Sequence, residues 1–585
     1  MPPTLDAQLA TLEACKSRFG SGAAAATGRI VGALSRQSFS DPKSLLRFHE
    51  SLLFLRAFAQ SSSVVRQVEG ILNRFHEGIE KLRASGGDMD VFDDFDTSGV
   101  AGTTMLDTLN FEAARWLVRR IPRNVEIAWE DYWDDSQAER AMGNTWPRLI
   151  PLLREDADVE ANIPWRRWLE VARAGQRELE WLIRRFEQLP VTSRERAELY
   201  DSLRIPIRWH LGNLRISRSR NWTRPRHLYF HEGPLITRSQ VSLAKELSLP
   251  APHLVKLKRP EGEQVMERIR EVMLVRYREL YGTTLGDASS VVRANLDRGV
   301  VMYFWNLPAA RRLPLRAYVA GFTLKNGVPV NYIEAIGLCE WIEVGFNTFY
   351  TYRQGETAWI YAQALRCLCA LTGAKTISVY PYQIGQNNDE ALDSGAFWFY
   401  RKLGFRSGRN DLEELARREE RRIAANPQYR TAKKTLKLLA EAHVFYELRG
   451  SERGAWDRFS ARNLGLRVNR RMARTFGGDS QRLRRASVDE VSRRLEMDLS
   501  RWRAAERQAL ENWALVLALI PDLRRWSRQE KQDVARIIRA QAGASEMHYL
   551  GLTQRHPRLR EELLRLGSKR RIGTYEDRAP VGERH

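Results

Sequence analysis

The chain has 585 residues, of which 43% are hydrophobic and 10% aromatic, so it holds enough apolar material for more than one core and is neither disordered nor fibrous. Its 94 lysines and arginines exceed its 72 acidic residues, which gives a formal net charge of +22. A basic surface attracts polyanions, but the same composition is typical of arginine-rich helices that are simply well solvated, and both interpretations remain open.

Four cysteines in this length exclude a disulfide framework, and Cys367 and Cys369 diverge because they are two residues apart on a predicted helix. No spacing of cysteine or histidine predicts a zinc site, and no metal site is expected. The first twenty residues lack a basic segment followed by an apolar run, and the apolar stretch at residues 513–520 is too short to cross a bilayer. We therefore expect a cytoplasmic protein with no membrane span.

Residues 1–235 form the first predicted domain, which is mostly helical. Apolar residues recur at helical spacing in residues 51–60 and 110–121. A stretch rich in glycine and aspartate interrupts them at residues 84–103. The spacing of its aspartates does not fit a calcium-binding loop, so we interpret it as a solvated acidic loop.

The end of this region combines arginines with Trp209 and Trp222. The arginines are Arg204, Arg208, Arg215, Arg218, Arg220 and Arg224. Phosphate contact together with base stacking would require this combination, so the stretch is a candidate nucleic-acid surface. The alternative is an arginine-rich connector that packs against its neighbours.

Residues 236–408 form the second predicted domain, in which short β-rich runs alternate with helices. Strands are predicted at residues 253–259, 299–306 and 375–381, a hairpin at residues 315–338, helices at residues 262–282 and 357–373, and a short helix leading into a last strand at residues 391–405. Asn326 and Gly327 supply the positive φ angles of the hairpin turn. The order β-α-β-β-β-α-β-α-β predicts a mixed α/β sheet.

Residues 409–585 form the third predicted domain, which is helical and basic. From Gly408 to His585 there are 40 lysines and arginines against 25 acidic residues. The fold class expected for the whole chain is therefore multidomain α+β, with a central mixed sheet flanked by N-terminal and C-terminal helical domains.

The segment SGAFWFYRKLGF at residues 394–405 is the most informative pattern in the chain. It resembles a motif of the GNAT superfamily of acyl-CoA N-acyltransferases, N-x-x-A-x-x-φ-Y-x-k-x-G-F, where φ is apolar. The matching residues are Ala396, Phe399, Tyr400, Lys402, Gly404 and Phe405. Asp393 stands in the asparagine position, and Asn388 lies just upstream. The resemblance covers about a quarter of the chain and implies a GNAT-like central domain between flanks that resemble no family.

The resemblance also implies acetyl-CoA or another acyl-CoA as acyl donor. Its diphosphate would bind at the loop and helix start of residues 352–365, because backbone N–H groups and the helix dipole favour an anion there. Arg353 and Ala358 fit the ends of the family pattern R/Q-x-x-G-x-G/A, whereas Glu356 replaces its glycine and Gly355 comes one residue early. The donor-binding residues implied are Arg353, Gln354, Gly355, Glu356, Thr357, Ala358, Asn388, Asp393 and Ala396.

For catalysis, the resemblance implies that Tyr400 acts as the general acid that protonates the leaving thiolate. The general base is expected on the strand that ends near residue 341, where Glu334 and Glu340 share one face by strand alternation. A carboxylate among apolar neighbours has a raised pKa, which suits a base, and Glu334 is the first candidate. For Glu334 and for Glu340 alike, the alternative is that the side chain is a carboxylate that forms an ion pair or faces solvent.

The function expected from these patterns is N-acyl transfer, in which an acyl group, in the simplest case acetyl, moves from acyl-CoA to an amine acceptor. The sequence predicts neither the identity of the acceptor nor the oligomeric state. The alternative function is a non-catalytic GNAT-like protein that binds nucleic acid or another protein, for which the net charge of +22 is the support.

Overall fold

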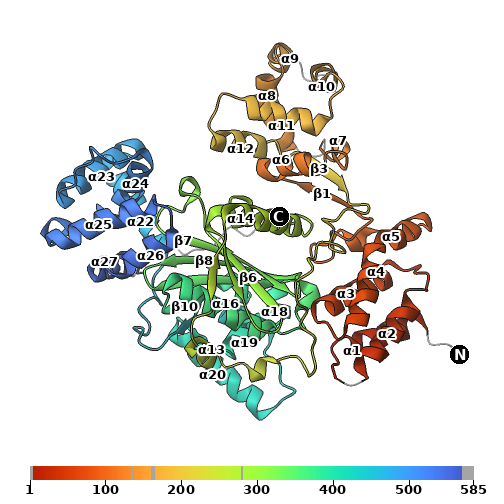
Figure 1. The fold of residues 1–585 in the computed structure, drawn as a ribbon. Coiled ribbons are helices and arrows are strands. Elements are labelled where there is room, and N and C mark those ends of the chain that lie inside the picture. Colours follow the sequence, from red (N-terminus) through yellow and green to blue (C-terminus); the bar gives the residue numbers. More distant parts are fainter. Residues whose placement is uncertain (1–3, 21, 133–135, 160–164, 279–280, 569–585) are drawn as a thin grey trace.

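In the computed structural model, which describes residues 4–20, 22–132, 136–159, 165–278 and 281–568, the chain forms three hydrophobic cores (Figure 1). The largest core contains a nine-stranded mixed sheet, a second core contains a small three-stranded sheet, and the third lies among C-terminal helices. The described part of the chain thus has the mixed α/β class that the sequence predicts.

The large sheet has the strand order β11-β12-β10-β9-β8-β7-β6-β5-β4. The strands are β4 (Leu254–Lys256), β5 (Val292–Asn295), β6 (Val300–Trp305), β7 (Ala317–Lys325), β8 (Val328–Leu338), β9 (Trp341–Thr348), β10 (Thr376–Val379), β11 (Arg406–Ser407) and β12 (Val444–Glu447). Neighbouring strands are antiparallel except β9 and β10, which are parallel. The hairpin between β7 and β8 turns at Asn326 and Gly327, whose φ angles are 49° and 79°, as the sequence predicts.

Helices cover the sheet on both sides (Figure 1). Helix α14 (Arg259–Leu274) lies on one side, and α16 (Thr357–Thr372) lies on the other. Helix α16 provides the crossover that two parallel strands require, and it ends at Gly373, whose φ of 69° is the left-handed conformation of a helix C-cap. Helices α17 (Pro381–Ile384), α18 (Asp389–Asp393) and α19 (Ala396–Arg401) follow β10.

The first 235 residues divide between two of the cores. Helices α1 (Leu5–Cys15), α2 (Ala23–Leu34), α3 (Pro42–Ala57), α4 (Ser62–Asn73) and α5 (Phe75–Ala84) share the core of the large sheet. Residues 104–216 form the second core around an antiparallel sheet of order β1-β3-β2, with β1 (Thr104–Thr108), β2 (Val125–Ile127) and β3 (Pro206–His210). These strands are absent from the sequence-based expectation because they are short and separated by helices such as α6 (Phe111–Arg120), α11 (Glu178–Gln188) and α12 (Ser193–Asp201).

The third core belongs to α22 (Ala461–Phe476), α23 (Ser480–Leu495), α24 (Ala504–Leu517), α25 (Arg528–Gln541), α26 (Glu546–Gln554) and α27 (Pro557–Gly567). The central sheet extends past Gly408, because β12 inserts between β10 and β11 after α20 (Asn410–Ala425) and α21 (Lys433–Leu439). Among the described residues, no helix combines the length and apolar character needed to cross a membrane.

Candidate active site

The large sheet opens between β9 and β10. These strands share three residue pairs, the last of which joins Glu343 to Ser378. Beyond this pair β9 continues to Thr348, whereas β10 ends at Val379 and the chain turns into α17. Among the described strands, β9 therefore has no partner on this edge after Glu343. Such an edge presents backbone N–H and C=O groups to an extended ligand.

Glu343 and His443 meet beside this opening. Phe346 of β9 packs on Tyr361 of α16, so by strand alternation Glu343 points to the opposite side of the sheet. There His443 Nε2 lies 2.8 Å from Glu343 Oε2, and Arg316 Nη1 lies 3.8 Å from Glu343 Oε1. The His443 side chain is 30% exposed and the Glu343 side chain 16%. The pair is therefore reachable from solvent but only partly hydrated.

Aromatic rings border the same place. The ring of His443 makes an edge contact with Tyr380, whose centroid lies 5.3 Å away. Tyr380 follows β10 directly and is 43% exposed, and Tyr382 of α17 is 49% exposed. Large exposed side chains at an opening in a sheet are typical of a binding surface.

Glu334 lies on the same face as Glu343, one strand away. Glu334 pairs with Gly345 and Ile336 pairs with Glu343, so the two glutamates are diagonal neighbours on β8 and β9. Glu334 accepts a hydrogen bond from the Tyr318 hydroxyl, and burial raises the pKa of Glu334. The structure thus places the first predicted base beside a second acid and a histidine.

Tyr400 lies on the other side of the sheet from Glu334. Its ring contacts Tyr361 of α16 and Phe405 at centroid distances of 5.7 Å each, and it is 4% exposed. Burial raises the pKa of Tyr400 above its ordinary value. The sheet therefore separates the two residues predicted as acid and base, and a ligand could touch both only through the opening between β9 and β10.

Glu340 lies at the contact with the C-terminal helices. It accepts hydrogen bonds from Trp456 Nε1 at 2.8 Å and from Arg560 Nε at 2.7 Å. Both partners come from segments that pack where β8 leads into β9, and Trp341 stacks on Trp456 with ring centroids 5.1 Å apart. These contacts are those of a residue that joins two parts of the fold.

The start of α16 is closed by a buried ion network. Glu356 is fully buried, pairs with Arg298, and lies 3.3 Å from Lys325 Nζ. Its carboxylate also accepts a hydrogen bond from Ile236 N at 3.1 Å. Burial lowers the pKa of Lys325 to about 8 although Glu356 acts to raise it. The Phe58 ring packs directly against Gly355, where a side chain would clash.

The other residues of the predicted donor loop lie outside this buried network, and they range from exposed to buried. Arg353 is exposed and pairs with Glu390 and, at 3.6 Å, with Asp96. Gln354 is exposed, and the Thr357 hydroxyl donates a hydrogen bond to Arg353 O at 3.2 Å. Ala358 is buried in the main core.

The residues predicted on the later helices also take local roles. Asn388 caps α18, because its side-chain oxygen accepts a hydrogen bond from Ala391 N at 3.1 Å. Asp393 is exposed and forms an ion pair with Lys433 at 3.0 Å. Ala396 begins α19. None of these three contacts Glu334 or Glu343 in the described structure.

The arginines of residues 204–226 are largely used inside the protein. Arg218 is 3% exposed, and its Nη2 donates to both carboxylate oxygens of Glu50, at 2.8 and 2.9 Å. Arg208 pairs with Asp131, Arg220 donates to the Asn213 carbonyl, and Arg224 pairs with Glu69. Arg204 and Arg215 are exposed. The stretch is therefore mainly a connector that joins the N-terminal helices to the second core.

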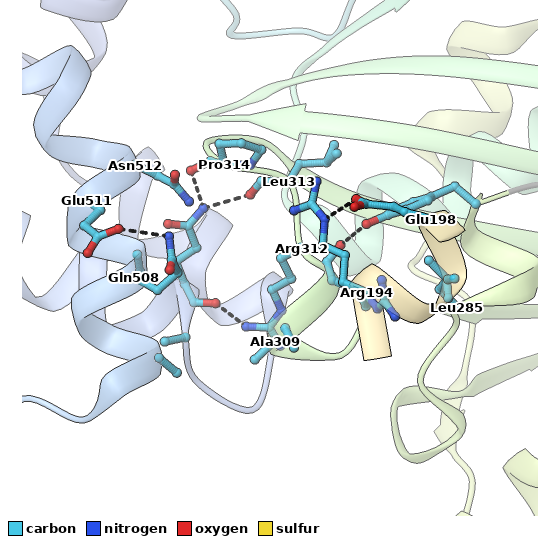
Figure 2. Close-up of a pocket in the computed structure, with 18 of the residues that line it drawn as sticks. Arg194, Glu198, Leu285, Ala309, Arg312, Leu313, Pro314, Gln508, Glu511 and Asn512 are labelled. Carbon is cyan, nitrogen blue, oxygen red and sulfur yellow. Dashed lines mark hydrogen bonds and ion pairs between the residues drawn. The ribbon is translucent and has the colours of Figure 1, made fainter. Parts of the chain in front are cut away.

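A cleft of about 1360 Å³ lies where α12, residues 309–314 and α24 come together (Figure 2). Gln541 Nε2 donates to the carbonyls of Leu313 and Pro314 on its wall, at 3.0 and 2.7 Å. The charged residues that line it are Arg194, Arg311, Arg312 and Arg484 against Glu112, Glu198, Asp201 and Glu511. Cations and anions are equal in number, so the cleft does not select a polyanion.

The cleft and the Glu343 site share a segment of chain. Pro314 lines the cleft, and Arg316, two residues later, reaches Glu343. Tyr281, which also lines the cleft, contacts the ring of Tyr318 with centroids 6.1 Å apart, and Tyr318 bonds to Glu334. A ligand in the cleft would thus touch neighbours of Arg316 and Tyr318, the residues that contact the two glutamates.

Comparison of the chain with protein-family models, curated proteins and solved structures finds no significant match. The site therefore has to be interpreted from its own geometry. Sequence reasoning missed Glu343 and His443. The alternation in WIEVGF of β9 and the strand-like run VFYE after His443 are the signals that could have indicated them.

Proposed function

We propose that the chain is an N-acyltransferase that joins an acyl group, delivered as a thioester, to an amine. The observation that carries this proposal is the position of the His443–Glu343 pair at the point where β9 and β10 separate. The order of elements supports it: a strand and a helix (β4 and α14), an antiparallel run, a helical crossover to parallel β10, and helices that lead to β11 follow the order that the GNAT resemblance implies. The antiparallel run has five strands, β5 to β9, whereas the sequence predicts three.

The free edge of β9 suits an extended donor arm. A pantetheine arm contains two amide groups, and amides in an extended chain can pair with an unpaired strand edge. An arm that entered between β9 and β10 would bring its thioester close to Glu343. Acyl-CoA is the donor that the resemblance implies, and it supplies the activated acyl group.

The start of α16 does not fit the diphosphate of such a donor. A helix N-terminus binds an anion because its N–H groups and dipole are uncompensated. Here the Glu356 carboxylate already balances Arg298 and Lys325, and Phe58 covers Gly355. The proposal therefore assigns no step to this loop and places only the acyl end of the donor.

The chemistry needs a base, because an ammonium cannot attack a carbonyl carbon. His443 Nδ1, the ring nitrogen that does not face Glu343, takes a proton from the ammonium, and Glu343 orients the ring and stabilises the imidazolium. The neutral amine then forms a C–N bond to the thioester carbon while the C–S bond breaks. The second proton of the amine leaves with the thiolate, and the relay that we assign to it is Glu334, a carboxyl with a raised pKa on the strand next to Glu343.

The acceptor amine would enter from the side of α14, where Glu343 and His443 face solvent. The cleft described above is lined by Pro314, two residues before Arg316 of this site, and has room for a large polar acceptor. Its balanced charges favour a zwitterionic or neutral acceptor over a polyanion.

A direct test is to incubate the protein with acyl-CoAs of increasing chain length and a panel of amines, and to measure acylated product by mass. Product mass is preferable to a thiol reagent, because the protein itself contains free cysteines, of which Cys15 and Cys369 are only partly buried. His443→Ala is the test variant and His548→Ala, an exposed histidine on α26, is the matched control. Product formation that needs His443 but not His548 supports the proposal; no product from any pair, or equal product from both variants, would refute it.

A further inference from the structure

The hairpin of α22 and α23 carries a concentrated positive charge. Residues 461–495 contain ten arginines, no lysine and three acidic residues, a net charge of +7. The two helices are joined by Gly477 and Gly478, and Asp479 caps α23 by accepting hydrogen bonds from Gln481 N and Arg482 N. This segment supplies almost half of the excess charge of the last third of the chain.

Nine of the ten arginines divide into an inner and an outer set, and the tenth, Arg493, is exposed and donates to Asp489 O within α23. Arg467 donates to Leu566 O, Arg471 pairs with Glu490, and Arg494 pairs with the same glutamate. These inner arginines fix the hairpin to its neighbours. The outer set is Arg462, Arg470 and Arg474 on α22 and Arg482, Arg484 and Arg485 on α23, all exposed. In the described part of the chain, Arg462, Arg470, Arg474 and Arg484 have no hydrogen-bond or ion-pair partner.

The outer arginines of α22 lie on one face. Residues 462, 466, 470 and 474 are four apart and therefore follow one stripe of the helix. Small residues, Gly465 and Ala473, and Asn469 stand beside them, and all are exposed. Leu464 is the only residue of α22 that is buried, and half of the residues of the helix are exposed.

We propose that this stripe, defined as Arg462, Arg470 and Arg474 with Arg482 and Arg485 at its flank, binds double-stranded DNA. An exposed helix of sixteen residues is about 24 Å long and fits a major groove about 12 Å wide. Arginine pairs with phosphates and guanine edges through a planar fork, and asparagine reads adenine. The small side chains let the helix backbone approach the groove.

Other polyanions fit this surface less well. Duplex RNA has a deep and narrow major groove that a helix does not enter. Single strands are bound on aromatic platforms, and no aromatic side chain of α22 or α23 is among the exposed large hydrophobic residues. Membrane-binding helices present a broad apolar face, whereas this stripe offers Leu466 alone.

The experiment is fluorescence anisotropy with a 30-base-pair DNA duplex on the full-length protein, over a series of salt concentrations. R470E/R474E is the test variant, and R418E/R421E, two exposed arginines of α20, makes the same change in charge. Removal of two phosphate contacts should weaken binding at least tenfold and reduce the slope of log affinity against log salt by about 1.8. The control variant should stay within about twofold of the parent. R470Q/R474Q adds no negative charge and should weaken DNA binding by the same order of magnitude as R470E/R474E.

The proposal is overturned if the two glutamate variants lose affinity equally, because net charge alone would then explain binding. It is also overturned if the parent binds no duplex DNA, or prefers duplex RNA, single-stranded DNA or anionic phosphatidylserine vesicles at equal salt. Circular dichroism and thermal melting of each variant should match the parent, since the substituted side chains form no hydrogen bond or ion pair with another described residue. This test does not involve acyl transfer, so its outcome is independent of the proposed function.

Discussion

His443 Nε2 lies 2.8 Å from Glu343 Oε2, although the two residues are 100 positions apart in the chain. Glu343 belongs to β9, His443 precedes β12, and β10 lies between these two strands. The contact therefore depends on β12, which pairs with β10 on the side away from β9 and brings His443 to the end of β10. A carboxylate at this position fixes the ring of a histidine and leaves its second nitrogen free for proton transfer.

Replacement of His443 should abolish most of the acyl transfer that we propose. A positioned general base contributes about 10²–10⁴ in rate, so His443→Ala should reduce kcat/KM by that factor, and Glu343→Gln should cause a smaller loss because the ring remains. Added imidazole should restore part of the activity of His443→Ala. A structural role alone would give no such rescue, and an undiminished rate in both variants would show that another group is the base.

The elements with strong periodicity could be predicted from the sequence. The hairpin of β7 and β8, α16 and β10 lie within the predicted ranges, because their apolar pattern and turn residues agree. Helix α14 overlaps its predicted range of residues 262–282 but begins three residues earlier. Strands β1, β2, β3 and β12 have only three to five residues, too short for a period to be visible, and their partners lie far away in the sequence. Their existence depends on tertiary pairing.

The candidate site could be predicted only in part. Glu334 stood out because a carboxylate interrupts an apolar strand, and the structure places it beside Glu343. The same rule selected Glu340, which instead bonds to Trp456 and Arg560 from the C-terminal region. Nothing in local sequence distinguishes the two, since the partners of Glu340 come from segments more than a hundred residues away.

Removal of the buried charge of Glu356 should destabilise the fold. Glu356→Gln keeps the shape of the side chain but leaves Arg298 and Lys325 without a counter-charge. Breaking a buried ion pair from one side costs about 3–5 kcal/mol, and we expect about 3 kcal/mol because Lys325, whose pKa is already lowered, can lose its proton. Urea unfolding measures this loss. Glu390→Gln, which removes an exposed partner of Arg353, should cost less than about 1 kcal/mol; equal costs would contradict the expectation.

The pair of Glu50 and Arg218 should make the fold sensitive to acid. Burial alone would raise the pKa of Glu50, but Arg218, His49 and Thr351 lower it to about 2. Because the pKa of Glu50 is depressed in the folded protein, its carboxylate stabilises the fold at pH values above the ordinary pKa of 4.5. This stabilisation is lost as the pH falls from 4.5 toward 2. Glu50→Gln should therefore be about 3 kcal/mol less stable than the parent at pH 7. The gap between their unfolding free energies should narrow between pH 4.5 and pH 2; a constant gap would exclude ionisation as its source.

Glu546 should have the opposite effect on the pH dependence of stability, because it should destabilise the fold as the pH rises. It is 1% exposed, its oxygens accept hydrogen bonds from Leu307 N and Tyr318 N, and burial raises its pKa to about 7. Below pH 4.5 the Glu546 carboxyl is protonated in both the folded and the unfolded chain, so its raised pKa does not change the stability of the fold. Between pH 4.5 and pH 7 the carboxyl ionises in the unfolded chain first, and the fold therefore loses stability as the pH rises. That loss amounts to about 3 kcal/mol.

Glu546→Gln cannot ionise, so its unfolding free energy should gain about 3 kcal/mol relative to the parent between pH 4.5 and pH 8. The amide can accept only one of the two backbone hydrogen bonds, which lowers its stability at every pH without changing this slope. The exposed Glu561→Gln is the control and should follow the parent throughout. If the difference between parent and Glu546→Gln were the same at pH 5 and pH 8, Glu546 would be ionised in the folded protein, and α26 would be held to β7 by a buried carboxylate with Arg312 as its counter-ion.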